Sequence, residues 1–229
     1  MVAIENAFES TDPFTPEARH IVVVSGGLGD PSQSTMLAKR LATATTDALS
    51  ESGIVPEVEV IELRLLATDI SNALIANNNS PALQKAIDQV AEADGVIAVS
   101  PTFKASYSGL FKSFWDLVDE IEFAGTPVLL GATGGTARHS LVIDQAMRPL
   151  FAYLKALVAP MSVFAASDDW GLVEGGSTST RTAPIQHRIS RAGEAFANLL
   201  EGRPVRPRKK QETETRELEV IPFEQLLHG

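Results

Sequence analysis

The sequence predicts an α/β protein in which a doubly wound, five-stranded parallel sheet is covered by helices on both faces. Short apolar runs rich in β-branched residues recur along the chain, and segments with helical periodicity separate them. Polar, glycine-rich turns follow three of these runs. The chain has 229 residues, of which 44% are hydrophobic and 21% are charged. This composition supports one core of about 180 residues with tails.

The first half of the domain begins with a predicted strand at residues 21–24, followed by a glycine-rich turn and an amphipathic helix carrying Leu37 and Leu41. Residues 58–63 mostly alternate between apolar and polar side chains, which is typical of a strand near the edge of a sheet. Residues 67–80 show no clear period and contain three consecutive asparagines. We therefore expect a long loop there.

The centre of the chain repeats the same alternation. Residues 81–93 are predicted to form a helix opened by proline, whose missing N–H has no helical partner to lose. Residues 95–99 form a short apolar run typical of a strand buried on both faces. A helix at 110–118 and a fourth strand at 127–130 follow.

The remaining elements are a helix at 141–157, a fifth strand at 161–165 and a last helix at 186–200. We expect a single domain at residues 19–201, between an N-terminal extension at 1–18 and a polar C-terminal tail at 202–229. A proline-broken basic cluster near the end is interpreted as part of a solvated tail. Its members are Arg203, Arg206, Arg208, Lys209 and Lys210.

Composition excludes several classes of function. The chain contains no cysteine, which removes disulfides, thiolate zinc sites and cysteine nucleophiles. Its formal net charge of −10 disfavours nonspecific binding to nucleic acid. The four histidines are scattered without metal-ligand spacing, so no metal site is expected. No segment has the features of a secretory signal or a membrane helix, and we expect a cytoplasmic protein.

Three polar turns are expected to converge, because turns that follow parallel strands lie at the carboxyl edge of the sheet, where such folds bind ligands. They are residues 25–35, 101–107 and 131–140. The first is rich in glycine and hydroxyl groups and leads into a helix, whose free N–H groups and positive dipole end favour a phosphate. An equally frequent alternative is a plain connection with a serine helix cap.

The first turn does not match the common nucleotide motifs. It lacks the Gly-Lys-Ser/Thr step of the P-loop. It also lacks the third glycine of the dinucleotide fingerprint, and no acidic residue ends the second predicted strand in a clear position.

The other two turns suit a planar ring system. The second offers an apolar platform, backbone amides and the cation of Lys104, although composition alone favours a core position for Phe103. The third has three glycines within residues 131–135, which remove side chains and permit positive φ. Backbone can therefore approach a ligand closely there.

Residues 101–151 carry a resemblance to a known family. The KASYSG turn, and the ATGG turn followed by MRPL, make this stretch similar to the NAD(P)H-dependent FMN reductases that supply reduced flavin to two-component alkanesulfonate monooxygenases. The resemblance covers roughly residues 21–165. It implies a flavodoxin-like fold with strand order 2-1-3-4-5, a homodimer or homotetramer, and hydride transfer from NADPH or NADH to FMN without a catalytic side chain.

The resemblance also assigns the turns. The first would hold the FMN phosphate, the second would line the flavin rings, and the third would lie near their pyrimidine edge. Tyr107 is similar to a tyrosine that in the sulfonate-type enzymes lies in a π-helical turn at the tetramer interface, near the flavin. The implied cofactor-binding residues are Ser25, Ser32, Gln33, Ser34, Thr35, Pro101, Thr102, Phe103, Lys104, Ser106, Tyr107, Thr133, Gly134 and Gly135.

The first turn departs from the family pattern, because Gly27 and Gly29 stand where a serine and an arginine are usual. One cation for the phosphate is therefore missing, and FMN would be held more weakly. Two alternatives stay open: a quinone or azo reductase that keeps FMN bound, and a nonenzymatic flavodoxin-like FMN-binding protein. The sequence decides neither the nicotinamide nor the monooxygenase partner.

Overall fold

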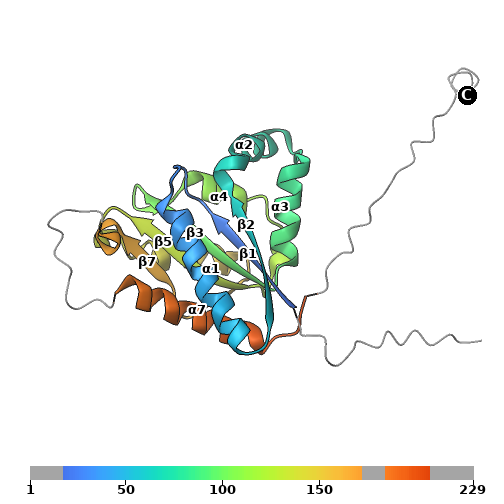
Figure 1. Cartoon of the computed structure of the whole chain (residues 1–229). Helices are drawn as coiled ribbons and strands as arrows, with labels where there is room; N and C mark the ends of the chain where they lie inside the picture. The colour runs from blue at the N-terminus through green and yellow to red at the C-terminus, as the bar shows by residue number, and fades with distance from the viewer. Residues whose placement is uncertain (1–17, 172–183, 207–229) are drawn as a thin grey trace, which may run out of the picture.

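The computed structural model describes residues 18–171 and 184–206. A parallel sheet in the order β2-β1-β3-β5 forms its centre, with β6 and β7 both paired to β5. Helices cover both faces (Figure 1), so the predicted fold class is confirmed. The strands are β1 (Ala18–Ser25), β2 (Val55–Glu62), β3 (Gly95–Phe103), β4 (Ser106–Tyr107), β5 (Pro127–Gly134), β6 (Leu157–Val158) and β7 (Val163–Ala166).

Most helical segments lie between these strands in chain order, and the last ones follow β7. Within the described residues, no helix is both long enough and apolar enough to cross a membrane. The α-helices are α1 (Gln33–Glu51), α2 (Ala67–Ala76), α3 (Pro81–Glu92), α4 (Gly109–Trp115), α5 (Glu120–Phe123), α6 (Arg148–Tyr153) and α7 (Ile185–Glu201). Shorter segments are the 3-10 turns η1 (Leu63–Leu66), η2 (Ala137–His139) and η4 (Ser167–Trp170), and the π-helix η3 (Ile143–Met147).

The central strands are buried on both faces, which explains why their sequences are continuously apolar. Alternate residues of β1 contribute to separate cores, since successive side chains of a strand point to opposite faces. Ile21 and Val23 pack with α1 and α7, whereas Val22 and Val24 pack with α3 and α4. All four are fully buried.

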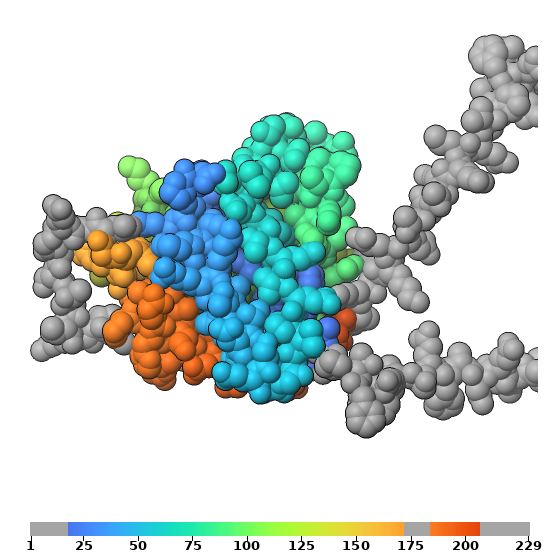
Figure 2. All heavy atoms as spheres, in the orientation of Figure 1, coloured from blue at the N-terminus to red at the C-terminus, as the bar shows by residue number. Residues whose placement is uncertain are grey.

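Helices α1 and α7 lie side by side over one face (Figures 1 and 2). A Cβ atom at Gly193 would lie only 2.6 Å from the Cβ of Ala44, so the absence of a side chain permits this close approach. The opposite face is filled by aromatic rings, among them Trp115 and Phe151 with centroids 4.7 Å apart. Phe111, Phe114 and Trp115, which lie on α4, are buried in this core.

Strand β2 is the edge strand, as its alternating sequence predicts. Its side chains are mostly exposed, including Val58 at 39% and Val60 at 42%. Its last residue is Glu62, so an acidic residue does end the second strand. The strand ends one residue before the predicted end at residue 63, so the prediction that no acidic residue ends it was wrong.

The loop expected at residues 67–80 was also wrong, because helix α2 occupies most of it. Only Ile70 and Ala73 are buried on this helix, too few to produce a clear period. Asn77 ends it in the left-handed conformation, φ 52°. Asparagine tolerates this conformation, so the asparagine run marks a helix end rather than a loop.

The helix predicted at 141–157 is broken in the structure. It begins as the π-helix η3, continues as α6, and is followed by β6. Pro149, in the first turn of α6, has no N–H for the regular helical hydrogen bond, which accounts for the wider turn before it. The helix predicted at 110–118 is also shorter in the structure. Helix α4 ends at Trp115, and Asp119 caps the separate helix α5.

The solvated tail was a wrong interpretation for its first residues. The Arg206 guanidinium donates to the carbonyls of Ala91 at 2.8 Å and Ala124 at 2.8 Å. Its backbone N–H donates to Asp94 Oδ1 at 2.7 Å. Burial, with the nearby charge of Arg203, lowers the pKa of Arg206 from its ordinary value. Arg208, Lys209 and Lys210 lie outside the described residues.

Candidate functional site

The three predicted turns meet at the carboxyl edge of the sheet around a groove of about 270 Å³. Its walls come from the turn before α1, the end of β3 and the end of β5. None of the residues that line it carries a charged side chain. Those residues are Gly27, Leu28, Gly29, Pro31, Ser32, Gln33, Ser34, Pro101, Thr102, Phe103, Thr133, Gly134 and Gly135.

Hydrogen bonds within the protein hold the first turn in place. The backbone N–H of Gly26 donates to the carbonyl of Val99 at 2.8 Å, which ties the turn to β3. Behind the turn, the buried hydroxyls of Ser25 and Thr35 are hydrogen-bonded at 2.9 Å. These two hydroxyls therefore position the turn, and they lie outside the groove lining.

Helix α1 starts at the groove with Ser32 as its N-cap. The Ser32 Oγ accepts the backbone N–H of Thr35 at 3.2 Å. The first turn of this helix has no acidic residue, so no carboxylate within the helix opposes the positive partial charge of the Gln33 and Ser34 N–H groups. This is a suitable environment for an anion.

Gly27 is required by the geometry of the turn. A Cβ atom there would lie 2.0 Å from Ser32 Oγ, closer than nonbonded atoms can approach. Glycine at this position therefore lets the turn fold against the helix cap. The sequence pattern showed a glycine-rich turn, and only the structure shows which glycine contacts the cap.

The second segment is a β-hairpin instead of an open turn. Strand β3 continues to Phe103 and pairs antiparallel with β4. The two residues at the tip, Lys104 and Ala105, both have positive φ, 49° and 66°. Phe103 is 47% exposed and lines the groove, which corrects the core position that composition favoured.

The third segment is mostly strand, since β5 extends to Gly134. Thr133 Oγ1 is hydrogen-bonded to Ser34 Oγ at 2.7 Å, which joins this strand to the start of α1. Neither Gly134 nor Gly135 adopts positive φ. A Cβ at Gly134 would lie 2.9 Å from the Phe164 ring, whereas Gly135 faces open space.

Besides Ser25 and Thr35, three of the predicted site residues lie away from the groove lining, all of them in the β3–β4 hairpin. Lys104 is exposed at the hairpin tip, and Ser106 pairs with Phe103 in the hairpin. Tyr107 lies in β4, so its expected place in a π-helical turn was wrong. The π-helix is η3, a separate segment that contacts β4.

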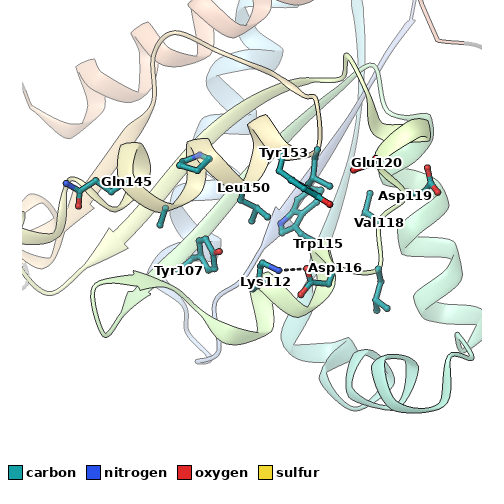
Figure 3. A pocket seen from close by; sticks show the side chains of 14 residues that line it. Tyr107, Lys112, Trp115, Asp116, Val118, Asp119, Glu120, Gln145, Leu150 and Tyr153 are labelled. Atoms are coloured by element: carbon teal, nitrogen blue, oxygen red, sulfur yellow. Dashed lines mark hydrogen bonds and ion pairs between the residues drawn. The ribbon is translucent and has the colours of Figure 1, made fainter.

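Tyr107 instead lines a larger cavity of about 960 Å³ between α4 and the η3–α6 segment (Figure 3). Gln145 and Tyr153 border the same cavity. Its rim carries three carboxylates against one cation, Lys112, which is itself paired with Asp116. This charge disfavours a phosphate, so the smaller neutral groove is the better candidate despite its size.

The groove has the features that FMN requires. Helical N–H groups at the start of α1 are available for a phosphate, the half-exposed ring of Phe103 offers an apolar surface, and bare glycine backbone borders the groove. Its volume is smaller than that of typical ligand pockets, which measure about 300–1,000 Å³. Much of a bound flavin would therefore stay exposed to solvent.

Fold and groove together define a flavodoxin-like α/β protein with an uncharged groove at the N-terminus of α1. The family model of the NADPH-dependent FMN reductases matches residues 19–171. The chain belongs to this family. It is an NAD(P)H:FMN oxidoreductase that uses FMN together with NADPH or NADH.

Individual relatives agree with this assignment. The chain is 37% identical to the FMN reductase (NADPH) of Pseudomonas aeruginosa, over 84% of this chain and 96% of that protein. It is 38% identical to the NADH-dependent FMN reductase SfnF of Pseudomonas putida, over 67% of this chain and 82% of that protein. The crystal structure of an oxidoreductase from Corynebacterium diphtheriae superimposes with a TM-score of 0.74 at 35% identity, covering 82% of this chain and all of the other.

Sequence reasoning missed several residues around the groove. Leu28 is 51% exposed and lines it, but an isolated leucine in a polar turn gives no signal. Arg64 follows β2 and contacts the first turn through Asp30. A cation directly after a strand at the carboxyl edge was a usable signal for it.

Proposed function

We propose that this oxidoreductase binds FMN in the groove at the carboxyl edge of β1, β3 and β5, and releases reduced flavin to a partner flavin-dependent monooxygenase. The observation that carries the proposal is the convergence of three separate chain segments on one uncharged groove at the N-terminus of α1. We place this activity in the cytoplasm.

The residues of the groove have distinct parts in this proposal. The N–H groups at the start of α1, with the Ser32 hydroxyl, bind the phosphate. The segment at residues 101–103 lies along the rings. The backbone N–H groups of residues 133–135 lie at the pyrimidine edge, where they stabilise negative charge.

Bound FMN supplies the ability to accept a hydride from the nicotinamide. None of the groove-lining side chains is an acid or a base. The protein therefore contributes binding and orientation, and the main rate advantage comes from holding the two reactants in a productive arrangement.

Nicotinamide oxidation measured side by side with FMN, FAD and riboflavin tests the proposal, using NADH and NADPH in parallel because the relatives differ in this preference. We expect FMN to be used more efficiently than riboflavin, since only FMN presents a phosphate to α1. Equal efficiency with riboflavin would place the phosphate site elsewhere. No oxidation with any flavin would contradict the enzyme activity itself.

The supply of reduced flavin to a partner is supported by the shallow groove, which favours release of FMN. Desalting the purified protein should remove FMN and leave a colourless, active enzyme. Supply to a partner would be contradicted by a protein that stays yellow after desalting and reduces quinones or azo compounds faster than it reduces added FMN.

We further propose a homodimer or homotetramer in which the face around the larger cavity is covered. Ile121 at 77% and Tyr153 at 73% exposure lie on this face or beside it, and the buried Trp115 indole N–H has no hydrogen-bond acceptor among the described residues. Light scattering should give a mass of two or four chains, and Tyr153→Glu should lower it. A monomeric wild type would contradict this assembly.

A further inference from the structure

The turn that faces the proposed phosphate position carries the wrong charge. Residues 25–35 include one charged side chain, the carboxylate of Asp30. The groove itself has no charged lining residue to offset it. An FMN phosphate would therefore approach backbone N–H groups with an acidic side chain in the same turn.

Arg64 offsets this charge from a different element. It lies in η1, immediately after β2, and its Nη2 donates to Asp30 Oδ2 at 3.1 Å. Its Nε donates to Glu62 Oε2 at 3.0 Å, which fixes the guanidinium in place. In Figure 2 the turn before α1, in blue, lies beside the cyan segment that follows β2.

Arg64 also shares a cavity with the start of α1. This cavity of about 390 Å³ is bordered by Arg64, Asp30, Ser32 and Thr35, and it shares Gly29, Pro31 and Ser32 with the groove. The turn thus separates the groove from the cavity that contains the guanidinium. Because the two cavities share these three residues, we expect the charge of Arg64 to act on the groove across the turn.

The other cations of this cavity are engaged elsewhere. The Arg40 guanidinium lies 4.8 Å from the centroid of the Trp170 ring. The Lys39 ammonium is 4.0 Å from Glu62, and its side chain is 59% exposed. Among the described residues, Arg64 is the cation that pairs with the turn itself.

We propose that Arg64 is a positioning residue for the phosphate of FMN, and that it acts through Asp30. It offsets part of the Asp30 charge, since the guanidinium also pairs with Glu62, and it holds the turn so that its N–H groups bind the phosphate. This inference rests on the proposed function. It goes further by naming the charge that lets an otherwise acidic turn select FMN over the unphosphorylated flavin.

Calorimetric titration of the whole protein with FMN and with riboflavin tests the inference. The quantity measured is the ratio of the two dissociation constants, which isolates the phosphate. Arg64→Gln should lower the preference for FMN by about fivefold, the upper range for an ion pair at the surface, and leave riboflavin affinity unchanged. Arg64→Lys should retain most of the preference, and the difference should shrink in about 0.5 M salt.

Variants of Asp30 provide a second test of the inference. Asp30→Asn should raise the FMN preference, and the double variant Asp30→Asn/Arg64→Gln should return it close to the wild-type value. The matched control is Lys39→Gln, which removes the same charge from the same cavity without touching Asp30. It should change the preference by less than about twofold.

An unchanged FMN preference in Arg64→Gln and in Asp30→Asn would overturn the inference. So would a double variant as weak as Arg64→Gln alone, because Arg64 would then not act through Asp30. These results leave the proposed function intact. In contrast, a wild-type protein that shows no heat with either flavin would remove the proposed function, and the inference with it.

Discussion

Gly27 shows how a single hydrogen atom in place of a side chain shapes the site. Its Cα hydrogen faces Ser32 Oγ, and a methyl group there would lie 2.0 Å from that oxygen. The Ser32 side chain is the part that can move. Its movement would break the cap of α1 and turn the hydroxyl away from the groove.

Gly27→Ala should therefore destabilise the protein by about 1 kcal/mol, the usual cost of losing an N-cap, and weaken FMN binding. Urea unfolding and FMN titration measure the two effects. Gly202→Ala is the matched control, because a Cβ there meets nothing within 4 Å and the residue follows α7, outside the groove lining. If both variants bind FMN equally well, the cap of α1 is not part of the binding site.

Asp119 gives a prediction for pH. Its carboxylate accepts the backbone N–H groups of Glu122 and Ile121 at the start of α5, and these bonds lower its pKa from the ordinary 3.8. A lowered pKa in the folded state means stability that is present above the ordinary pKa and is lost as pH falls through the folded value.

Asp119→Asn should therefore lower stability most near pH 7, where the carboxylate charge contributes, and the variant should approach the wild type as pH falls below about 4. Thermal unfolding between about pH 2 and pH 7 follows the difference between variant and wild type. A difference that stays constant across this range would show that the Asp119 charge does not contribute through the cap.

At the scale of single residues, the sequence revealed the chemical types at the site but not their partners. Thr133 and Ser34 were expected to act separately on the ligand, whereas the structure joins them by a hydrogen bond. Residues so far apart in the chain meet only when β5 and α1 pack together. The periodicity of apolar residues along the chain cannot predict a contact between two such distant side chains.

Among the elements, the β3–β4 hairpin is the most unusual. Lys104 and Ala105 both occupy the left-handed region, in which two-residue hairpins normally place asparagine and glycine. Each left-handed non-glycine residue costs about 1–2 kcal/mol. The pairing of Phe103 with Ser106 and Thr102 with Tyr107 holds this conformation.

Replacing Ala105 with glycine should stabilise the protein by about 0.5–1 kcal/mol, because glycine relieves the strain but gains entropy in the unfolded chain. Ala105→Val should shift the free energy of unfolding in the opposite direction, since β-branched residues tolerate positive φ least. Chemical denaturation compares the two. Equal stabilities would show that the tip is not strained.

Elements were predictable where many residues of one face are buried. Helix α3, with four buried apolar residues and proline at its start, lies within one residue of its predicted range. Helix α2, with only two buried residues, was missed. The π-helix η3 was missed because it depends on a backbone hydrogen-bond pattern that apolar periodicity does not encode.

At the scale of the whole molecule, residues 203–206 attach the end of α7 to the segments that precede β3 and β5, at the amino-terminal ends of the strands and opposite the groove. Arg203 donates to the carbonyl of Gly125 at 3.0 Å, and Arg206 donates to Ala91 and Ala124. Asp94 accepts N–H groups from both His20 and Arg206, at 2.8 and 2.7 Å. This segment thereby links β1, α3 and the start of β5.

Arg206→Ala should lower the free energy of unfolding by about 2 kcal/mol, because several carbonyls lose a charged donor. FMN affinity should not change, since the groove is at the other end of the strands. Arg191→Ala, on an exposed position of α7, is the control and should have little effect. A stability equal to that of the control would contradict the anchoring role.

The sequence by itself determined the alternation of strands and helices, the edge position of β2 and the three turns at one edge of the sheet. These follow from local patterns of apolar residues and glycine, which are written along the chain. Only the tertiary structure decided which side chains line the groove, that Phe103 is exposed in it, and that Arg64 reaches Asp30. Those features depend on contacts between distant segments, and such contacts exist only once the sheet and its helices have packed.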